Sequence, residues 1–236
     1  MLHYSVIIPI YNEAENIPFL VKELEWVMHN HKDSWELIFI DDGSTDQSEQ
    51  VLEKLKASKP FIRCVQLKKN YGQSSAFIAG VKAARGTWII SLDGDGQNDP
   101  RDIPKLLELS DYDLVAGIRQ KRQDSWYKKL IGKAANAVRS RILNDDTTDT
   151  GCSLKMYRRS CLDKIPLFNG MHRFLPALFK IEGFSCTEIP VHHRQRRAGK
   201  SKYHLFNRGI SLVFDLFGVL WMRKRRLHYE VKRELP

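Results

Sequence analysis

Cysteine is scarce in this chain, and its cysteines do not stand close together. The 236 residues contain four cysteines, and none of them forms a C-x-x-C pair with another. That spacing excludes the common zinc-binding patterns and a dense disulfide framework. Four scattered thiols in a chain of this length are typical of a protein in a reducing cytosol.

Long apolar runs are also missing. No stretch of the sequence reaches the about 18 consecutive apolar residues that are typical of a membrane span. The first residues have neither a basic leader nor a long apolar core, so they indicate a first strand rather than a signal peptide. We therefore expect a protein that does not cross a bilayer by itself.

Basic residues, in contrast, are in surplus. Hydrophobic residues make up 42% of the chain and charged residues 28%, which describes one large folded domain or one domain with an appendage. The 38 lysines and arginines exceed the 28 aspartates and glutamates, so the formal charge is +10. Such a surplus favours an anionic partner, namely nucleic acid, a phosphorylated substrate or an acidic membrane surface.

Short apolar runs alternate with stretches of helical periodicity in the first half of the chain. The apolar runs predict strands at residues 4–10, 35–40, 62–67, 87–90 and 112–117. Helices are expected at residues 13–30, 44–58 and 70–84 and after residue 99. Ser44 or Thr45 is expected to cap the second of them. This order predicts an α/β fold with a mainly parallel sheet flanked by helices on both faces.

The most informative stretch lies at residues 91–100 and reads SLDGDGQNDP. It directly follows a predicted buried strand, and the carboxyl end of a strand in an open α/β sheet faces the crevice where ligands bind. Asp93 and Asp95 are two residues apart, so we expect them to converge on one hard cation such as Mg²⁺. The Gln97 amide oxygen is a further candidate ligand. A plain turn rich in Asp and Gly is the alternative.

Other acids and amides follow two more predicted strands, at residues 12–13 and 41–42. The ends of parallel strands meet at one edge, so a polar cluster is expected there. Asp149 lies in a later turn that leads into a strand. It is a candidate general base, with a turn or capping role as the alternative.

The second half of the chain carries the basic surplus. A helix with one basic face is predicted at residues 124–143, and that face is either solvated or in contact with an anionic surface. A helix at residues 171–181 and an extended segment at 186–191 follow. The cationic loop at residues 192–203 is suited to clamp a diphosphate, because Arg gives bidentate contacts and Lys a point charge. Nucleic-acid binding and a solvated charge run are the alternatives.

The last apolar segment, at residues 205–221, is predicted to be a helix with one narrow polar stripe. A basic run at residues 223–226 follows it. An apolar face beside basic charge suits a helix that lies in a membrane interface. Packing on the main domain or on a second copy of the chain is the alternative. We therefore divide the chain into a main domain, 1–203, and an amphipathic helix with a basic tail, 204–236.

Four motifs occur in order along the chain: SVIIPIYNE at residues 5–13, DDGSTD at 41–46, NYGQ at 70–73 and LDGDGQ at 92–97. Together they resemble glycosyltransferase family 2. Segments at residues 117–126, 149–152 and 196–203 are similar to the branch that glycosylates polyprenyl phosphates. That branch includes the dolichyl-phosphate mannose synthases and, nearer still, the undecaprenyl-phosphate 4-deoxy-4-formamido-L-arabinose transferases. The resemblance extends over nearly the whole chain.

The resemblance implies a GT-A fold, which is Rossmann-like, a nucleotide-sugar donor and a divalent cation, Mg²⁺ or Mn²⁺. It implies donor contacts from Pro9, Tyr11, Glu13, Asp42, Gln73 and Asp93. The implied metal ligands are Asp93, Asp95 and Gln97. Phosphate groups of the donor and the acceptor are expected at Arg119, Arg122, Arg196, Ser201 and Lys202. The expected catalytic residues are Asp95 and Asp149.

The resulting hypothesis is an inverting transferase that moves a sugar, from a UDP-linked donor by preference, to a polyprenyl phosphate such as undecaprenyl phosphate. It would act in cell-envelope biogenesis, as a cytoplasmic protein peripheral to the inner membrane. Relatives in this branch usually carry a pair of transmembrane helices where this chain has the 205–221 helix. One alternative is a family 2 transferase that acts on a hydroxyl of a soluble saccharide or a glycolipid. A second is a non-catalytic nucleic-acid- or membrane-binding module, but acids at the strand ends would repel nucleic-acid phosphates.

Overall fold

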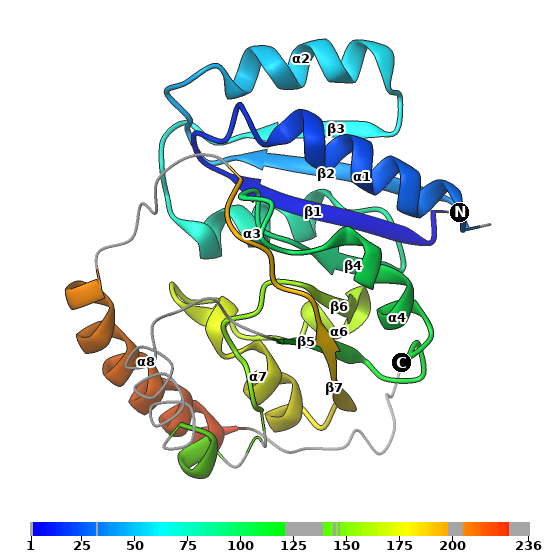
Figure 1. The fold of residues 1–236 in the computed structure, drawn as a ribbon. Coiled ribbons are helices and arrows are strands. Elements are labelled where there is room, and N and C mark those ends of the chain that lie inside the picture. The colour runs from blue at the N-terminus through cyan, green and yellow to red at the C-terminus, as the bar shows by residue number, and fades with distance from the viewer. Residues whose placement is uncertain are drawn as a thin grey trace, which may run out of the picture.

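The computed structural model describes residues 2–31, 33–120, 139–143, 145, 147–197 and 205–226, with side chains in the last segment described from residue 213. The described residues form a seven-stranded sheet in the order β3-β2-β1-β4-β6-β5-β7 (Figure 1). The strands are β1 (Tyr4–Ile10), β2 (Trp35–Asp41), β3 (Ile62–Gln66), β4 (Trp88–Ser91), β5 (Leu114–Arg119), β6 (Lys155–Arg158) and β7 (Cys186–Val191).

The sheet is mostly parallel, as the alternation of apolar runs and helical segments predicts. The pairings β2–β3, β1–β2, β1–β4 and β5–β7 are all parallel. Strand β6 is the exception, because it runs antiparallel to both of its neighbours, β4 and β5. The predicted α/β class and mainly parallel sheet are therefore confirmed, with one inverted strand inside the sheet.

Helices cover both faces of this sheet. They are α1 (Ile17–His29), α2 (Ser48–Ser58), α3 (Gln73–Ala83), α4 (Ile103–Leu107), α6 (Arg159–Leu162), α7 (Leu175–Ile181) and α8 (Leu205–Arg225), with 3₁₀ turns η1 (Pro100–Asp102) and η2 (Met171–Arg173). Successive residues of a strand point to opposite faces. Accordingly Val6 and Ile8 belong to the core under α1 and α4, whereas Ile7 belongs to the core under α3 and α7.

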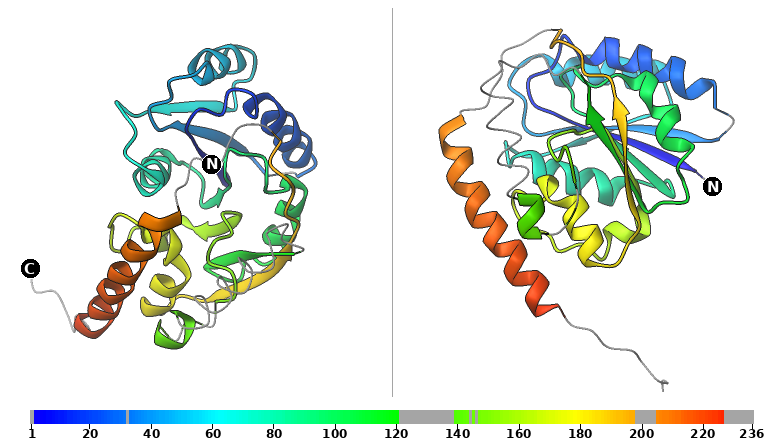
Figure 2. Two further views of the ribbon diagram at one scale, coloured as in Figure 1. Left: turned by 60° about the vertical axis from the view of Figure 1, so that its left-hand side comes forward. Right: turned by 60° about the horizontal axis from the view of Figure 1, so that its bottom comes forward.

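Helix α8 lies along the outside of the layer that contains α7 (Figure 2). Its inner side chains, Leu216, Val219 and Leu220, pack against the same core as α7. Among the described residues, no helix is both long enough and apolar enough to span a membrane. The helix predicted at residues 124–143 lies mostly outside the described residues, and only its last residues, 139–143, are seen as helical.

The predicted cap of the second helix is wrong. Helix α2 begins at Ser48, and neither Ser44 nor Thr45 occupies its N-cap position. The Ser44 hydroxyl instead accepts a hydrogen bond from the Asn12 backbone N–H at 2.8 Å. A side chain that caps a helix must lie within the turn before it, and Ser44 is already engaged by the neighbouring strand end.

Gly86 lies between α3 and β4, where the backbone packs closely against β1. A Cβ atom at this position would lie 2.6 Å from the Ser5 backbone nitrogen, and backbone cannot move aside easily. We expect Gly86→Ala to lower the free energy of unfolding by about 1–3 kcal/mol, as overpacking typically does. Chemical denaturation measures this change.

The matched control is Gly218→Ala in α8, where nothing lies within 4 Å. That variant should raise stability by up to about 1 kcal/mol, because Ala favours helix. Equal destabilisation by both substitutions would contradict the steric explanation.

Candidate active site

A cavity of about 390 Å³ opens at the carboxyl ends of β1, β2 and β4. Eight residues of the sequence hypothesis line it: Pro9, Tyr11, Glu13, Asp42, Gln73, Asp93, Asp95 and Arg196. These residues come from five separate segments of the chain. The fold thus brings together the motifs after β1, β2 and β4, the start of α3 and the segment that follows β7.

The turns after β1 and β2 are joined to each other. Asn12 has a positive φ of 55°, a conformation that Asn tolerates better than most residues. Its side-chain oxygen accepts from the Thr45 backbone N–H at 2.6 Å. In the same place the Glu13 N–H donates to the Ser48 hydroxyl at 3.0 Å. These contacts fix the loop that carries Tyr11 and Glu13 into the cavity.

Asp42 shapes the opposite wall. Its carboxylate oxygens accept from the backbone N–H groups of Tyr71 and Gly72, both at 2.8 Å. Gly72 has a φ of 89°, which favours glycine, and it is the residue just before α3. Burial raises the pKa of Asp42, although those two hydrogen bonds act against the rise. The carboxylate therefore positions the loop from which Gln73 enters the cavity.

Asp93 is half-buried and lines the cavity. Its Oδ1 accepts from Gln73 Nε2 at 3.0 Å, and its backbone N–H donates to Asn98 Oδ1 at 3.1 Å. Burial, followed by repulsion from Asp95, raises the pKa of Asp93. Two carboxylates that repel each other in this way favour either a shared proton or a cation between them.

Asp95 is paired with an arginine. Its Oδ2 accepts from Arg196 Nη2 at 2.7 Å, and its Oδ1 accepts from the Gln97 backbone N–H at 3.0 Å. The Arg196 guanidinium also approaches Glu13 Oε1, at 3.5 Å. A positive charge thus lies between the acid of the first motif and the acid of the fourth. The arginine stands where a divalent cation on Asp95 would be expected.

The segment that carries Arg196 crosses the sheet from β7 toward α1 (Figure 1). Arg194 forms ion pairs with Glu23 at 2.9 Å and with Asp99. The Arg197 guanidinium lies 3.6 Å from the centroid of the Phe19 ring. We call residues 192–197 the strap. The contacts of Arg194 and Arg197 hold the strap in place, so the backbone that carries Arg196 has a fixed position beside the cavity.

The Gln97 side chain is engaged differently from those of the other predicted metal ligands. It does not line the cavity, and its side-chain Nε2 faces the Arg194 carbonyl oxygen at 3.5 Å. Its backbone carbonyl accepts from the Arg194 N–H at 2.9 Å. In this structure Gln97 therefore holds the strap.

Asp149 forms a bidentate ion pair with Arg119. Arg119 Nε donates to Oδ2 and Nη2 donates to Oδ1, both at 2.7 Å. Neither side chain lines the cavity. With both oxygens engaged by the guanidinium, this carboxylate orients Arg119 in the structure. The predicted phosphate contacts Arg122, Ser201 and Lys202 lie outside the described residues.

Comparison with known proteins agrees with this arrangement. Residues 5–166 match the family model described as glycosyl transferase family 2. The chain belongs to this family. The match spans every strand from β1 to β6, and it includes all four motifs that line or support the cavity.

Solved structures of three other proteins share the fold. Glucosyl-3-phosphoglycerate synthase from Mycobacterium tuberculosis is 17% identical, with a TM-score of 0.69 over 94% of this chain and 80% of that one. A mannosyltransferase from Pyrobaculum calidifontis is 19% identical, with a TM-score of 0.64 over 92% and 63%. TarS from S. aureus is 18% identical, with a TM-score of 0.60 over 94% and 67%. These neighbours establish a GT-A fold for this family 2 protein.

The sequence hypothesis missed three residues that support the site. Asn98 Oδ1 accepts from both the Asp93 N–H and the Ser153 hydroxyl, the latter at 2.7 Å. Lys155 is buried, and its ammonium group donates to the Cys152 carbonyl oxygen. Asn98 lies in the stretch at residues 91–100 and Ser153 directly follows the segment at 149–152, so their position is a usable signal. Lys155 gave none, because a lysine in a basic run is usually exposed.

The cavity fits a divalent cation held mainly by phosphate. Among the described residues, no group of three or more His, Cys, Asp and Glu side chains could hold a metal ion. Asp93 and Asp95 supply two carboxylates, and Mg²⁺ commonly uses one or two together with water and substrate phosphates. The arginine on Asp95 shows that this position already accommodates a positive charge.

The Arg196–Asp95 ion pair predicts competition with a divalent cation. Arg196→Gln should tighten binding of Mn²⁺ alone by about tenfold, because a charge-assisted hydrogen bond worth on the order of 1.5–3 kcal/mol no longer has to be broken. Electron paramagnetic resonance of free Mn²⁺ measures this affinity without nucleotide. The control is Arg197→Gln, which removes an arginine that contacts Phe19 instead. Unchanged or weaker Mn²⁺ binding by Arg196→Gln would show that the arginine does not compete.

Proposed function

We propose that this family 2 protein is an inverting glycosyltransferase. It moves a sugar from a nucleotide-sugar donor, UDP-linked by preference, to a polyprenyl phosphate at the cytoplasmic face of the membrane. The observation that carries the proposal is the cavity in which Asp93, Asp95 and Arg196 meet beside the loop after β1. Carboxylates that hold a cation and an arginine that binds phosphate are what a leaving nucleoside diphosphate requires.

The neighbours support the donor class and the cation. The Mycobacterium tuberculosis synthase was solved with Mn²⁺ and uridine diphosphate, and the Pyrobaculum mannosyltransferase with GDP-Man and Mn²⁺. By analogy, Pro9, Tyr11, Glu13, Asp42 and Gln73 would hold the nucleoside part of the donor. Asp93 and Asp95 would hold Mg²⁺ or Mn²⁺. Such an ion, when bound, offsets the charge that develops on the diphosphate.

A phosphate acceptor suits the way Asp149 is held. A hydroxyl acceptor needs a base to take its proton, whereas a phosphate is already anionic at neutral pH. The described residues place Asp149 in a bidentate pair with Arg119, and do not leave its carboxylate facing the cavity. Arg119 and Arg196 would meet the phosphate groups, together with Arg122, Ser201 and Lys202. Direct displacement by the acceptor phosphate inverts the anomeric carbon.

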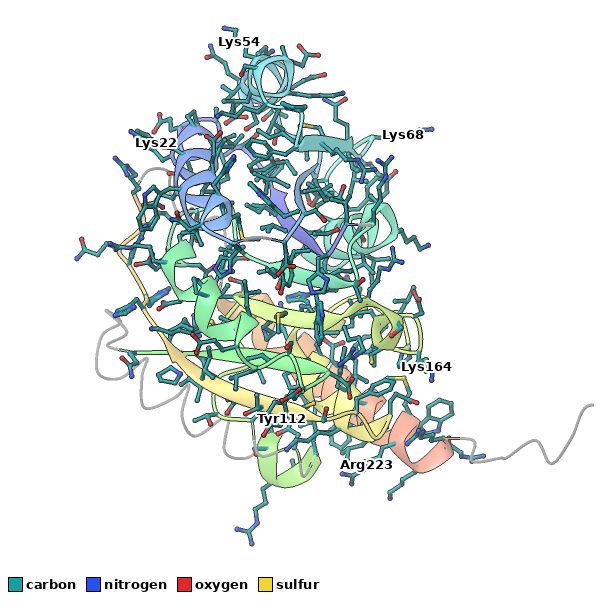
Figure 3. The ribbon with its side chains drawn as sticks, turned by 90° about the vertical axis from the view of Figure 1, so that its right-hand side faces the viewer. Lys22, Lys54, Lys68, Tyr112, Lys164 and Arg223 are labelled. Carbon is teal, nitrogen blue, oxygen red and sulfur yellow. The ribbon has the colours of Figure 1, made fainter. Side chains whose placement is uncertain are left out.

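Helix α8 supports a lipid acceptor. Its outer face exposes Phe214, Phe217 and Trp221, and its end carries Lys224 and Arg225. Aromatic side chains enter the interfacial layer of a bilayer, and basic ones are attracted by anionic lipids. Figure 3 places Arg223 of α8 at the end of the molecule opposite Lys54 of α2. We therefore propose a protein peripheral to the inner membrane, with α8 against the lipid and residues 1–203 as the catalytic domain.

A hydroxyl acceptor, on a soluble saccharide or a glycolipid, is the second candidate. It is favoured by the Mycobacterium tuberculosis neighbour, which was solved with phosphoglyceric acid or glucosyl-3-phosphoglycerate. The motifs at residues 117–126, 149–152 and 196–203 favour the polyprenyl-phosphate branch instead. A soluble acceptor would also leave the aromatic face of α8 without a role.

The function is tested by product formation from a panel of UDP- and GDP-sugars with undecaprenyl phosphate, with Mn²⁺ or a chelator. We expect a lipid-linked sugar from one donor, abolished by the chelator, which removes the cation, and by Asp95→Asn, which removes a carboxylate that would hold it. The control is Asp163→Asn, an exposed acid far along the chain, which should retain activity.

The other outcomes are informative. Hydrolysis of one donor without lipid product would keep the donor site and reject the acceptor. Full activity of Asp95→Asn would reject the metal assignment, and product with the donor's anomeric configuration would reject direct displacement.

The membrane assignment is tested with two tryptophans of equal exposure. Trp221 on α8 is 63% exposed and Trp26 on α1 is 64% exposed. We expect Phe217→Ser with Trp221→Ser to reduce sedimentation with anionic vesicles by about tenfold or more, since each aromatic contributes on the order of 1.5–3 kcal/mol when buried. Trp26→Ser should leave it unchanged. Equal losses in both variants, or none, would contradict docking through α8.

A further inference from the structure

Lys155 is a buried cation that the proposed chemistry leaves unused. It is the first residue of β6, between β4 and β5, and it is only 3% exposed. Its ammonium group reaches the carbonyl oxygens of Cys152 and, at 3.5 Å, of Thr150. Within the described part of the chain it forms no ion pair with a carboxylate.

A buried ammonium without a direct counter-ion is costly. Moving an ammonium group out of water remains unfavourable even after the surroundings relax. Burial lowers the pKa of Lys155, and the charges of Asp149 and Asp93 act against that change from a longer range. A neutral side chain of similar length would avoid this cost, so a lysine at this buried position calls for a role that such a side chain would not fill.

The backbone that Lys155 holds is the turn at residues 149–153. This turn carries Asp149, whose carboxylate orients Arg119. It also carries Ser153, whose hydroxyl donates to Asn98 Oδ1, the atom that receives the Asp93 N–H. The Ser153 carbonyl accepts from the Ser91 hydroxyl at 2.6 Å, which ties the turn to the end of β4. One short turn therefore sets the position of both an arginine and a carboxylate of the site.

We propose that Lys155 is a positioning residue for the cation and diphosphate site. Its ammonium fixes the 149–153 turn, and through that turn it holds Asp93 and Arg119 in place. Its charge also acts on Asp93, where it opposes the rise in the pKa of that carboxyl that burial causes. Lys155 itself touches no ligand, because it does not line the cavity. This role of Lys155 rests on the proposed function only because that function identifies the ligand as a diphosphate.

The test is the affinity for Mn²⁺ alone, by electron paramagnetic resonance, and for UDP with Mn²⁺, by calorimetry. We expect Lys155→Met to weaken both by about 10- to 100-fold, the range typical of residues that support metal ligands. Lys155→Arg should recover most of the loss, since it keeps the charge and the donors. The matched control is Lys82→Met, which removes an exposed lysine of α3 and should change neither affinity.

A second route guards against loss of folding. Ser153→Ala leaves Lys155 in place and removes the hydroxyl that ties the turn to Asn98 and hydrogen-bonds Asp93. It should weaken Mn²⁺ binding in the same direction. Thermal melting identifies which variants are folded. Wild-type Mn²⁺ affinity in a folded Lys155→Met or in Ser153→Ala would overturn the proposal, as would an arginine variant no better than the methionine one.

The two proposals fail in different ways. A wild-type protein that binds Mn²⁺ and UDP but transfers no sugar would count against the proposed function alone, and the Lys155 comparison would still be decided by binding. A wild-type protein that binds neither would overturn both.

Discussion

Repulsion between carboxylates at the edge of the sheet is the constraint on which the rest of this site depends. Parallel strands bring their carboxyl ends together, and three acids of the cavity follow two of these strands, β2 and β4. Each acid is satisfied differently: Asp42 by backbone N–H groups, Asp95 by Arg196 and Asp93 by Gln73. These carboxylates are therefore held in place before any ligand arrives, which is the preorganisation that a cation site requires.

The two halves of the site are built by different means. The walls near Tyr11 and Asp42 use contacts between neighbouring loops of consecutive βα units. The strap and the 149–153 turn come from the far part of the chain, and Arg194 is 171 residues from its partner Glu23. The first half is local in sequence and the second is not. The walls near Tyr11 and Asp42 are therefore fixed by the parallel sheet, whereas the strap and the 149–153 turn depend on long-range ion pairs.

Much of this could be predicted from the sequence. The strand ends, the motif residues and the layered α/β fold follow from period and turn chemistry, because those signals are local. The antiparallel insertion of β6 and the pairing of Arg196 with Asp95 could not be predicted, since they depend on which distant segments meet. Lys155 was missed for the same reason: its burial is set by β4 and β5 on either side, and its own sequence neighbours are basic.

The order of strands also bears on how the chain folds during synthesis. Strands β1 to β4 can form a parallel unit as soon as residue 91 has emerged, because each has a partner among the earlier strands. Strand β5 pairs only with β6 and β7, both of which come later. Until residue 158 appears, β4 and β5 therefore present unpaired edges, which are the surfaces most prone to association with other chains. A nascent chain of this protein passes through a stage in which the walls near Tyr11 and Asp42 are formed while β4 and β5 still lack a partner strand.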